Sequence, residues 1–228
     1  MVAPADLDAE LRQQGFLLRG GFHPRPDDAV PPLPDGRRAG TVLLVGSAGP
    51  GLWAAVSASP EAGRPDPVDR YTARAISGLA ARLGLAALFP FDGPPWHPFQ
   101  RWAVRAEPGL RPSPLGVLIH PVFGLWHAYR AALLVAEALP LPEPAPLEHP
   151  CERCADRPCL HACPAGALTS DTYDVPRCRA YLQAHPDAPC HEVGCLARHA
   201  CPVGREWAQS PAQAAHHTAA FTGGPSQR

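Results

Sequence analysis

The stretch Cys151-Glu-Arg-Cys154-Ala-Asp-Arg-Pro-Cys159-Leu-His-Ala-Cys163-Pro164 decides how this chain is organised. It holds four of the eight cysteines, and Cys178, Cys190, Cys195 and Cys201 follow it within about fifty residues. Residues 1–150 contain no cysteine. We therefore expect a cysteine-free part followed by a cysteine-rich part.

The spacing of these cysteines indicates iron–sulfur chemistry. The first run reads C-x2-C-x4-C-x3-C-P and has two more residues before its third cysteine than the bacterial ferredoxin run C-x2-C-x2-C-x3-C-P. The second group also ends in a Cys-Pro pair, Cys201-Pro202. A tight loop supplies three thiolates to one cube, while the fourth cysteine begins a helix that leads away, with proline at its first position. In two-cluster ferredoxins that fourth cysteine binds the other cluster.

This exchange of ligands predicts two [4Fe–4S] clusters that use all eight cysteines. The first cluster would be held by Cys151, Cys154, Cys159 and Cys201. The second cluster would be held by Cys163, Cys178, Cys190 and Cys195. Three alternatives stay open, namely two structural zinc sites, disulfides, and a single cluster with spare thiols.

Composition and charge limit the partners. The formal net charge is −1, there is no lysine, and no basic stripe of the kind that binds nucleic acid. The first residues lack the basic start and apolar core of a signal peptide, and no window approaches the roughly 18 apolar residues that span a bilayer. We expect a cytoplasmic protein with reduced thiols and no membrane or nucleic-acid partner.

The first part of the chain alternates between strand and helix patterns. This alternation predicts a layered α/β domain. Residues 126–139 are apolar and fit either a strand or a helix. The expected strands are Thr41–Gly49, Ala86–Phe91 and Leu115–Pro121, and the expected helices are Ala5–Phe16, Asp66–Leu83, Phe99–Glu107 and, after the cysteines, Gly204–Phe221 with a kink or restart at Pro211.

Several of these segments resemble two known families. The cysteine layout, the lone Cys178 in VPRCRAYL and the preceding HPVFGLWHAYR resemble epoxyqueuosine reductase, a cobalamin-dependent enzyme with two [4Fe–4S] clusters. The stretches DPVDRYTARAISGL (66–79) and GVLIHPVFGLWHAYRAALL (116–134) resemble the cobalamin-processing protein CblC. The second cysteine group departs from the reductase pattern, because Cys195-x5-Cys201-Pro stands where that family has C-x2-C-x3-C-P.

The resemblance implies a nitroreductase-like, CblC-like α/β sandwich followed by a small α-rich, two-cluster ferredoxin-like domain. We expect an N-terminal helix and proline-rich arm at 1–38, the α/β domain at 39–148, the cluster domain with a C-terminal helix at 149–221, and a disordered tail at 222–228.

The resemblance also implies roles for residues outside the cysteines. Asp92 corresponds to an acidic residue proposed as a proton donor, and an ordinary turn role in Asp-Gly is equally open. Arg130 resembles an arginine that contacts cofactor or cosubstrate, against the alternative of a surface arginine. The expected corrinoid-binding residues are His120, Phe123, Gly124, Trp126 and Arg130. For His120 the alternative is a hydrogen-bonded histidine at a strand end.

The function implied is that of an oxidoreductase, either like epoxyqueuosine reductase or like a cobalamin reductase. Electrons from a flavodoxin- or ferredoxin-type donor would pass through two [4Fe–4S] clusters to a cobalamin, with a small molecule as substrate. The reductase's C-terminal repeat region is missing, so recognition of transfer RNA is not expected to carry over. The alternatives are a ferredoxin-like electron carrier without a corrinoid and a remnant that kept the fold but lost the corrinoid pocket.

Overall fold

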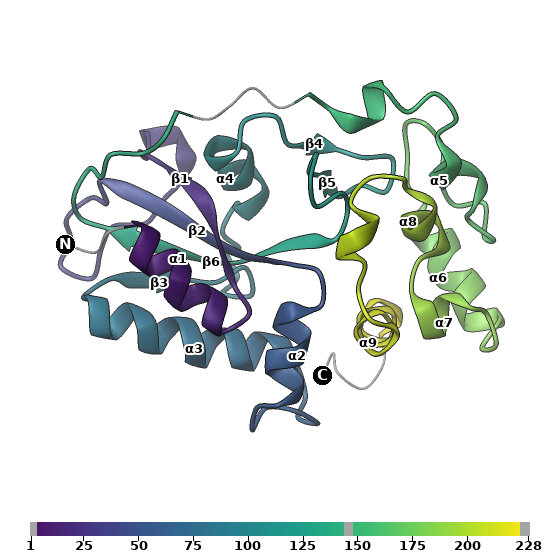
Figure 1. Ribbon diagram of the computed structural model, residues 1–228, viewed down its shortest axis with the longest axis horizontal. Helices are drawn as coiled ribbons and strands as arrows, with labels where there is room; N and C mark the ends of the chain where they lie inside the picture. The colour runs from purple at the N-terminus through teal and green to yellow at the C-terminus, as the bar shows by residue number, and fades with distance from the viewer. Residues whose placement is uncertain (1–3, 144–147, 224–228) are drawn as a thin grey trace. The chain divides into compact units, whose positions relative to one another are not determined.

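The computed structural model describes residues 4–143 and 148–223, and its contacts divide the chain into two units. The first unit comprises residues up to Gly109 together with Ala128–Pro146, and the second comprises Leu110–His127 and Leu147 onwards. Figure 1 shows a sheet with helices in the first unit and mostly short helices in the second. The expected α/β domain followed by a small α-rich part is confirmed. The expected tail, 222–228, lies mostly outside the described residues.

A four-stranded sheet with the order β1-β2-β6-β3 forms the centre of the first unit. β1 (Leu17–Phe22) pairs antiparallel with β2 (Thr41–Ala48), and β3 (Ala86–Leu88) pairs antiparallel with β6 (His127–Val135). The strand expected at Thr41–Gly49 is therefore present, and of the one expected at Ala86–Phe91 only Ala86–Leu88 is a strand. The apolar segment that fitted either pattern is the strand β6.

Helices cover both faces of this sheet. All eight residues of β2 are buried, as expected for a strand without a solvent-facing side. Leu43 and Val45 belong to a core shared with α1 (Pro4–Gln13), α2 (Gly51–Ser57) and α3 (Pro67–Leu83). The alternate residues Val42 and Leu44 are also fully buried but point to the other face, where α4 (Phe99–Ala106) lies against β1 and β2.

Helix α3 forms where the sequence predicts a helix because its start, apolar face and end are all encoded locally. Pro67 occupies its first turn, and Gly84 ends it in a left-handed conformation with φ 66°. Tyr71, Ala75 and Leu79 recur at helical spacing and are buried against the sheet. Asp66 is its N-cap residue, and Asp69 lies in the first turn.

The N-terminal residues are part of the sheet unit and do not form a separate arm. Leu7, Leu11 and Phe16 are almost fully buried in the core beneath the sheet. The strand β1 was not expected, because LLRGGF contains two glycines and lacks a clear alternation. Its pairing with β2 is irregular between Leu18 and Gly21, where Gly20 has φ 67°.

The second unit consists of a small hairpin and short helices. The prediction of a strand at Leu115–Pro121 in the main sheet is wrong. Only Leu118–Ile119 (β5) is extended, and it pairs with Arg111–Pro112 (β4), because residues 113–117 turn back on themselves through a Ser113–Val117 hydrogen bond of 2.8 Å. The helices are η2 (Pro150–Glu152), α5 (Pro158–His161), α6 (Val175–Ala184), α7 (Cys190–Val193), α8 (Leu196–Ala200), η3 (Arg205–Trp207) and α9 (Pro211–Thr222), with η1 (Pro26–Asp28) in the first unit.

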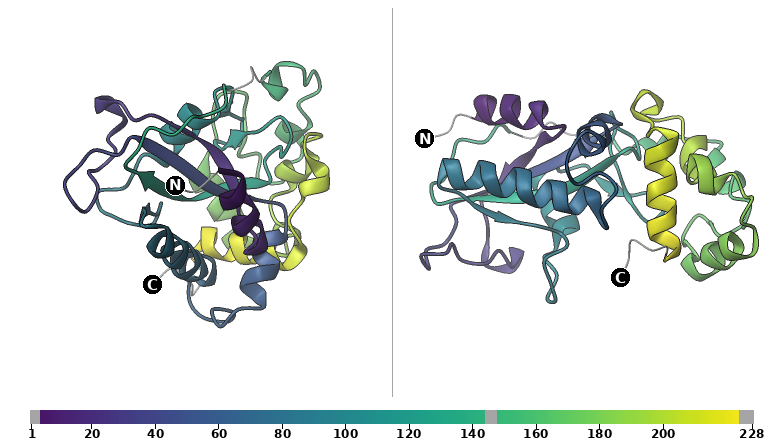
Figure 2. Two further views of the ribbon diagram at one scale, coloured as in Figure 1. Left: turned by 60° about the vertical axis from the view of Figure 1, so that its left-hand side comes forward. Right: turned by 90° about the horizontal axis from the view of Figure 1, so that it is seen from below.

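The observed division differs from the expected boundary near residue 148. Leu115, Ile119 and Leu125 pack with Leu168 and Ala197 in one small core, so the segment 110–127 belongs with the cysteine-rich residues. Helix α9, the last helix in Figure 2, begins at Pro211, where a restart was predicted. The Ser210 hydroxyl caps its first turn by accepting the Gln213 backbone N–H. No helix in the described ranges combines the length and the apolar character that a bilayer crossing demands.

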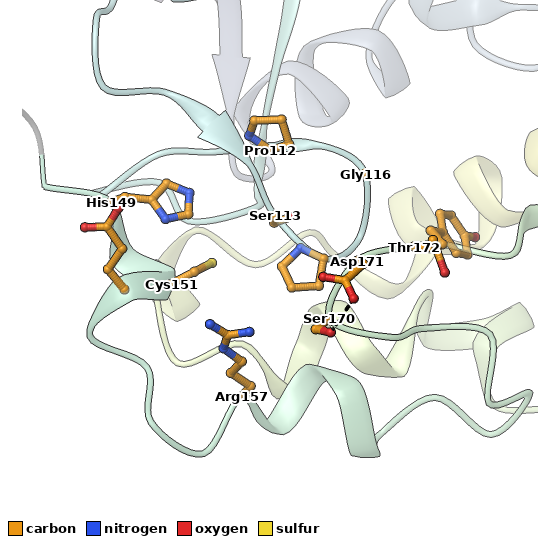
Figure 3. A pocket seen from close by; sticks show the side chains of 12 residues that line it. Pro112, Ser113, Gly116, His149, Cys151, Arg157, Ser170, Asp171 and Thr172 are labelled. Atoms are coloured by element: carbon orange, nitrogen blue, oxygen red, sulfur yellow. Dashed lines mark hydrogen bonds between the residues drawn. The ribbon is translucent and has the colours of Figure 1, made fainter.

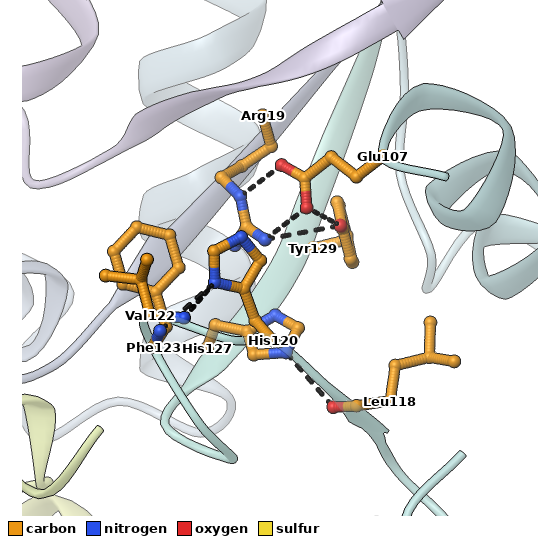
Figure 4. A network of polar contacts seen from close by, with 8 residues as sticks. All are labelled: Arg19, Glu107, Leu118, His120, Val122, Phe123, His127 and Tyr129. Atoms are coloured by element: carbon orange, nitrogen blue, oxygen red, sulfur yellow. Dashed lines mark hydrogen bonds and ion pairs between the residues drawn. The ribbon is translucent and has the colours of Figure 1, made fainter. Parts of the chain in front are cut away.

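A buried ion pair joins three elements of the first unit (Figure 4). The Arg19 guanidinium on β1 donates to both carboxylate oxygens of Glu107, at 2.7 Å and 2.6 Å. The Tyr129 hydroxyl on β6 donates to the same carboxylate at 2.8 Å. Burial, reinforced by that carboxylate, raises the pKa of Tyr129, so the phenol stays a neutral donor.

This network gives a stability prediction. Replacing Glu107 by alanine should lower the free energy of unfolding by about 3–5 kcal/mol, because the Arg19 side chain, only 2% exposed, would keep its charge without a carboxylate. Chemical denaturation followed by circular dichroism measures the loss. The control is Asp35→Ala, which breaks the exposed Arg37–Asp35 pair and should change little. Equal effects of the two substitutions would contradict the role given to the buried pair.

Candidate metal centre

All eight cysteines lie in the second unit, on short helices and the loops between them. Cys151 lies in η2, Cys159 in α5 and Cys178 in α6. Cys190 begins α7, whereas Cys195 and Cys201 flank α8 on either side. The remaining two, Cys154 and Cys163, lie in loops. All eight thiols are free, so the structure contains no disulfide among them.

One group of four thiols interacts electrostatically around Cys151. Burial, together with the neighbouring Cys201, Cys159 and Cys154 thiols, raises the pKa of the Cys151 thiol to about 11. Burial followed by Cys201 and Cys154 raises the pKa of Cys159. Burial also raises the pKa of Cys201, with Cys154 as the contributing thiol. Cys201 therefore lies close to the first run although about forty residues separate them.

The other four thiols form a second group. Burial raises the pKa of Cys178, and Cys163 and Cys190 raise it further. Burial also raises the pKa of Cys195, with Cys190 and Cys163 as the contributing thiols. Among the described thiols with a shifted pKa, none is affected by a thiol of the other group. Within the described ranges, no three His, Cys, Asp or Glu side chains are arranged to hold a single metal ion.

Tyr173 contacts the second group of thiols. Its hydroxyl hydrogen-bonds the Cys178 sulfur, an interaction that lowers the pKa of that thiol against the effect of burial. Asp174, the next residue, caps α6 by accepting the Arg177 amide N–H at 2.9 Å, which fixes the helix that carries Cys178. Tyr173 was not predicted from the sequence. Its position directly after the exposed segment 169–172 and before the helix cap Asp174 is only a weak signal.

Arg198 on α8 anchors the segment that lies between Cys195 and Cys201. It donates to the Leu125 carbonyl and, at 3.2 Å, to the Gln209 side chain. Its guanidinium also lies 4.5 Å from the centre of the Trp126 ring. Burial lowers the pKa of Arg198 to about 10, which still leaves it charged at neutral pH. The sequence offered no signal for this role, because the partners come from a distant segment.

Four of the expected corrinoid-binding residues lie on the segment 110–127 and are engaged within the second unit. His120 Nδ1 accepts the backbone N–H groups of Val122 and Phe123 at 3.0 and 3.1 Å (Figure 4). Phe123 stacks on His120 and meets the edge of Trp207. Trp126 is 3% exposed, and its ring also contacts His199. The structure thus gives these side chains packing and turn roles within their own unit.

Gly124 lets two backbone segments of the second unit come close together. It has φ 56°, and a Cβ atom placed there would lie 2.0 Å from the Val203 carbonyl oxygen. Val203 follows Cys201-Pro202, so this contact fixes the backbone just after a cysteine of the first group. Only glycine fits at this position.

Asp92 and Arg130 lie in the first unit. The Asp92 carboxylate is exposed and accepts the Phe89 backbone N–H at 3.0 Å, which closes a turn after β3. The Arg130 side chain on β6 is 16% exposed, with Asp69 at the limit of an ion pair, 4.0 Å. Its Nε atom is buried and has no hydrogen-bond partner among the described residues, and burial lowers its pKa. A buried polar atom of this kind is what a bound ligand would satisfy.

Comparison with known proteins finds similarity only among solved structures. Epoxyqueuosine reductase from Streptococcus thermophilus matches with 15% identity over 90% of this chain and 67% of its own, at a TM-score of 0.45. An epoxyqueuosine reductase solved with a tRNA-Tyr stem loop matches with 15% identity over 91% of this chain and 68% of its own, at a TM-score of 0.46. The C. elegans B12-trafficking protein CblC matches with 14% identity over 92% of this chain and 87% of its own, at a TM-score of 0.47. No family model and no curated protein matches the chain. Both families that the sequence resembles are thus among the similar structures, and at this identity the similarity concerns the fold alone.

The Gly124 contact leads to a prediction about the second unit. Gly124→Ala should destabilise it by at least about 2 kcal/mol more than Gly116→Ala, because Val203 must move to admit the new methyl group. Gly116 is the matched control, since it has φ 73° but its added Cβ would meet no atom closer than 3.8 Å. Thermal unfolding of both variants measures the difference. Equal destabilisation would show that the close approach to Val203 is unimportant.

Proposed function

We propose that this protein is an iron–sulfur oxidoreductase that holds two [4Fe–4S] clusters. The first cluster would be bound by Cys151, Cys154, Cys159 and Cys201. The second cluster would be bound by Cys163, Cys178, Cys190 and Cys195. When bound, such clusters supply one-electron transfer at low potential.

The grouping of the thiols is the observation that carries this proposal. The two electrostatic groups have the same members as the two ligand sets expected from the sequence, including the exchange of Cys163 and Cys201 between the runs. Free thiolates packed together repel one another, and iron removes that repulsion by neutralising their charge. Thiolate is also the ligand type that iron–sulfur clusters require.

Residues around the thiols would orient the ligands and adjust the cluster potentials. The Tyr173 hydroxyl would donate to the Cys178 sulfur, and the Arg198 cation lies near Cys195. Hydrogen bonds and positive charge near the sulfurs favour the more negative, reduced cluster.

Metal and sulfide content test the proposal. Protein purified without oxygen should contain about eight iron atoms and eight acid-labile sulfides per chain, the content of two [4Fe–4S] clusters. Cys154→Ser and Cys178→Ser should each remove about half of the iron, and electron paramagnetic resonance should show that each variant loses a different cluster. Cys201→Ser should match Cys154→Ser, and Cys163→Ser should match Cys178→Ser.

The control for these variants is Asp156→Asn, an exposed change within the first run that should keep the full iron content. A colourless protein that contains two zinc ions per chain would overturn the proposal, because structural zinc sites also use four thiolates each. Loss of the same signal from the Cys154 and Cys178 variants would overturn the division into two sets.

We further propose that the clusters deliver electrons to a corrinoid bound by the sheet unit. The support within this unit is the buried Nε atom of Arg130, which lacks a partner among the described residues. Arg130 would bind the cofactor and Asp92, which is exposed at the end of its turn, would supply a proton. We leave His120, Phe123, Gly124 and Trp126 out of this binding site, since they belong to the second unit and their side chains pack there.

A visible spectrum tests the corrinoid proposal independently of the clusters. Cobalamin added to anaerobic protein should shift its bands towards the base-off form. Arg130→Met should weaken this binding about tenfold or more, as expected for loss of a charged hydrogen-bond donor, while Asp92→Asn should keep it. Arg101→Met, at an exposed position of α4, is the matched control for the charge change.

The engaged side chains of the segment 110–127 favour a second candidate, a ferredoxin-like electron carrier that binds no corrinoid. Full iron content with an unchanged cobalamin spectrum would support this carrier and exclude the corrinoid proposal. Either outcome leaves the assignment of the cluster ligands intact.

A further inference from the structure

A pocket of about 370 Å³ opens beside Cys151 within the second unit (Figure 3). Its volume falls in the range of small-molecule sites. Pro112 from the hairpin and Arg157 from the first cysteine loop contribute to its lining, together with the turn at 170–173. All of these residues belong to the second unit, so the pocket is formed within it.

Arg157 supplies positive charge to this pocket. The residue has φ 38° and ψ 56°, a left-handed conformation in the loop that joins Cys154 to α5. Figure 3 shows its guanidinium directed towards the space beside the Cys151 sulfur. Among the described residues, no carboxylate lies within 4.0 Å of it.

His149 provides an unused hydrogen-bonding atom in the same lining. Its Nε2 atom is buried and has no hydrogen-bond partner in the described part of the chain. Buried polar atoms are nearly always paired, so this nitrogen points to a bound molecule or ordered water. A guanidinium and an imidazole that share one pocket suit a ligand with several acceptor oxygens.

We propose that this pocket binds a small molecule carrying a carboxylate or phosphate group, with Arg157 pairing with the oxyanion and His149 completing its hydrogen bonding. The ligand would lie against Cys151, a proposed ligand of the first cluster. Its negative charge would then disfavour reduction of that cluster and lower its midpoint potential. This last effect rests on the proposed function, whereas the binding itself does not.

Asp171 allows a test of the direction in which charge affects ligand binding. Its carboxylate lines the pocket, as does Glu152 beside Cys151, and it accepts the Ser170 hydroxyl at 3.0 Å. An oxyanion in the pocket would be repelled by this charge. Removing the Asp171 charge should therefore strengthen binding, in contrast to removal of the Arg157 charge.

Calorimetry on the anaerobic, iron-loaded protein tests the site with two probes, inorganic phosphate and succinate. We expect at least one probe to bind with a Kd of about 1 mM or lower. The preferred probe distinguishes a phosphate site from a carboxylate site. Arg157→Gln should weaken binding about tenfold or more, and Asp171→Asn should strengthen it severalfold. Arg153→Gln is the matched control, because Arg153 lies in the same loop but pairs with Glu148 outside the lining.

A redox titration of the same samples should show the bound probe lowering the potential of one cluster and leaving the other unchanged. Failure of both probes to bind, equal binding by the Arg157 and Arg153 variants, or weaker binding by Asp171→Asn would each overturn the proposed site. If Arg157→Gln loses iron, its binding result cannot be assigned to the pocket alone. The Asp171→Asn variant then tests the site, because Asp171 lies outside the cysteine runs. If the purified protein contains no iron but a probe still binds in calorimetry, the binding site is supported and the cluster proposal fails.

Discussion

The second unit depends on bringing eight sulfurs from separate short segments into two small spaces. Thiolates in such a space repel each other and lose hydration, and the raised pKa of Cys151 and Cys178 shows both effects. The unit has few long elements to oppose this cost. Apart from α6 and α9, its described helices have five residues or fewer, and the hydrophobic cluster around Leu115 and Ala197 has six buried residues. Iron–sulfur clusters would remove the repulsion and connect the segments, so cofactor binding and folding are expected to be coupled.

The segment 110–127 explains how so small a unit keeps its shape. Gly124 allows the backbone to approach Val203, and Leu125 and Trp126 hold Arg198 on the helix between two cysteines. These contacts place the residues after Cys195 without any direct contribution from the sulfurs. A segment that resembles part of a corrinoid-binding domain therefore also acts as structural support for the proposed clusters.

The first unit has a different source of stability. Its sheet is covered on both faces, and the buried Arg19–Glu107 pair with Tyr129 fixes β1 and β6 relative to the end of α4. This core is complete without a cofactor. Two of its described side chains, Arg105 and Arg130, have a buried Nε without a hydrogen-bond partner, and the Arg105 Nε lies 3.5 Å from an Asp28 carboxylate oxygen. The proposed corrinoid would therefore add function to a unit that is already stable, whereas the proposed clusters would be part of the folding of the other.

The sequence by itself determined the features that depend on local spacing. Helix α3 has its proline, apolar face and glycine within twenty residues, and the buried strand β2 is a continuous apolar run. The cysteine spacing also predicts two ligand sets, which stay a proposal, because the geometry of each run limits which sulfurs reach one cube. The tertiary structure decided what depends on distant contacts. These include the glycine-containing strand β1, the membership of residues 110–127 in the second unit, and the positions of Tyr173 and Arg157 beside cysteines. No local pattern encodes these features, because each arises only when segments far apart in the chain pack together.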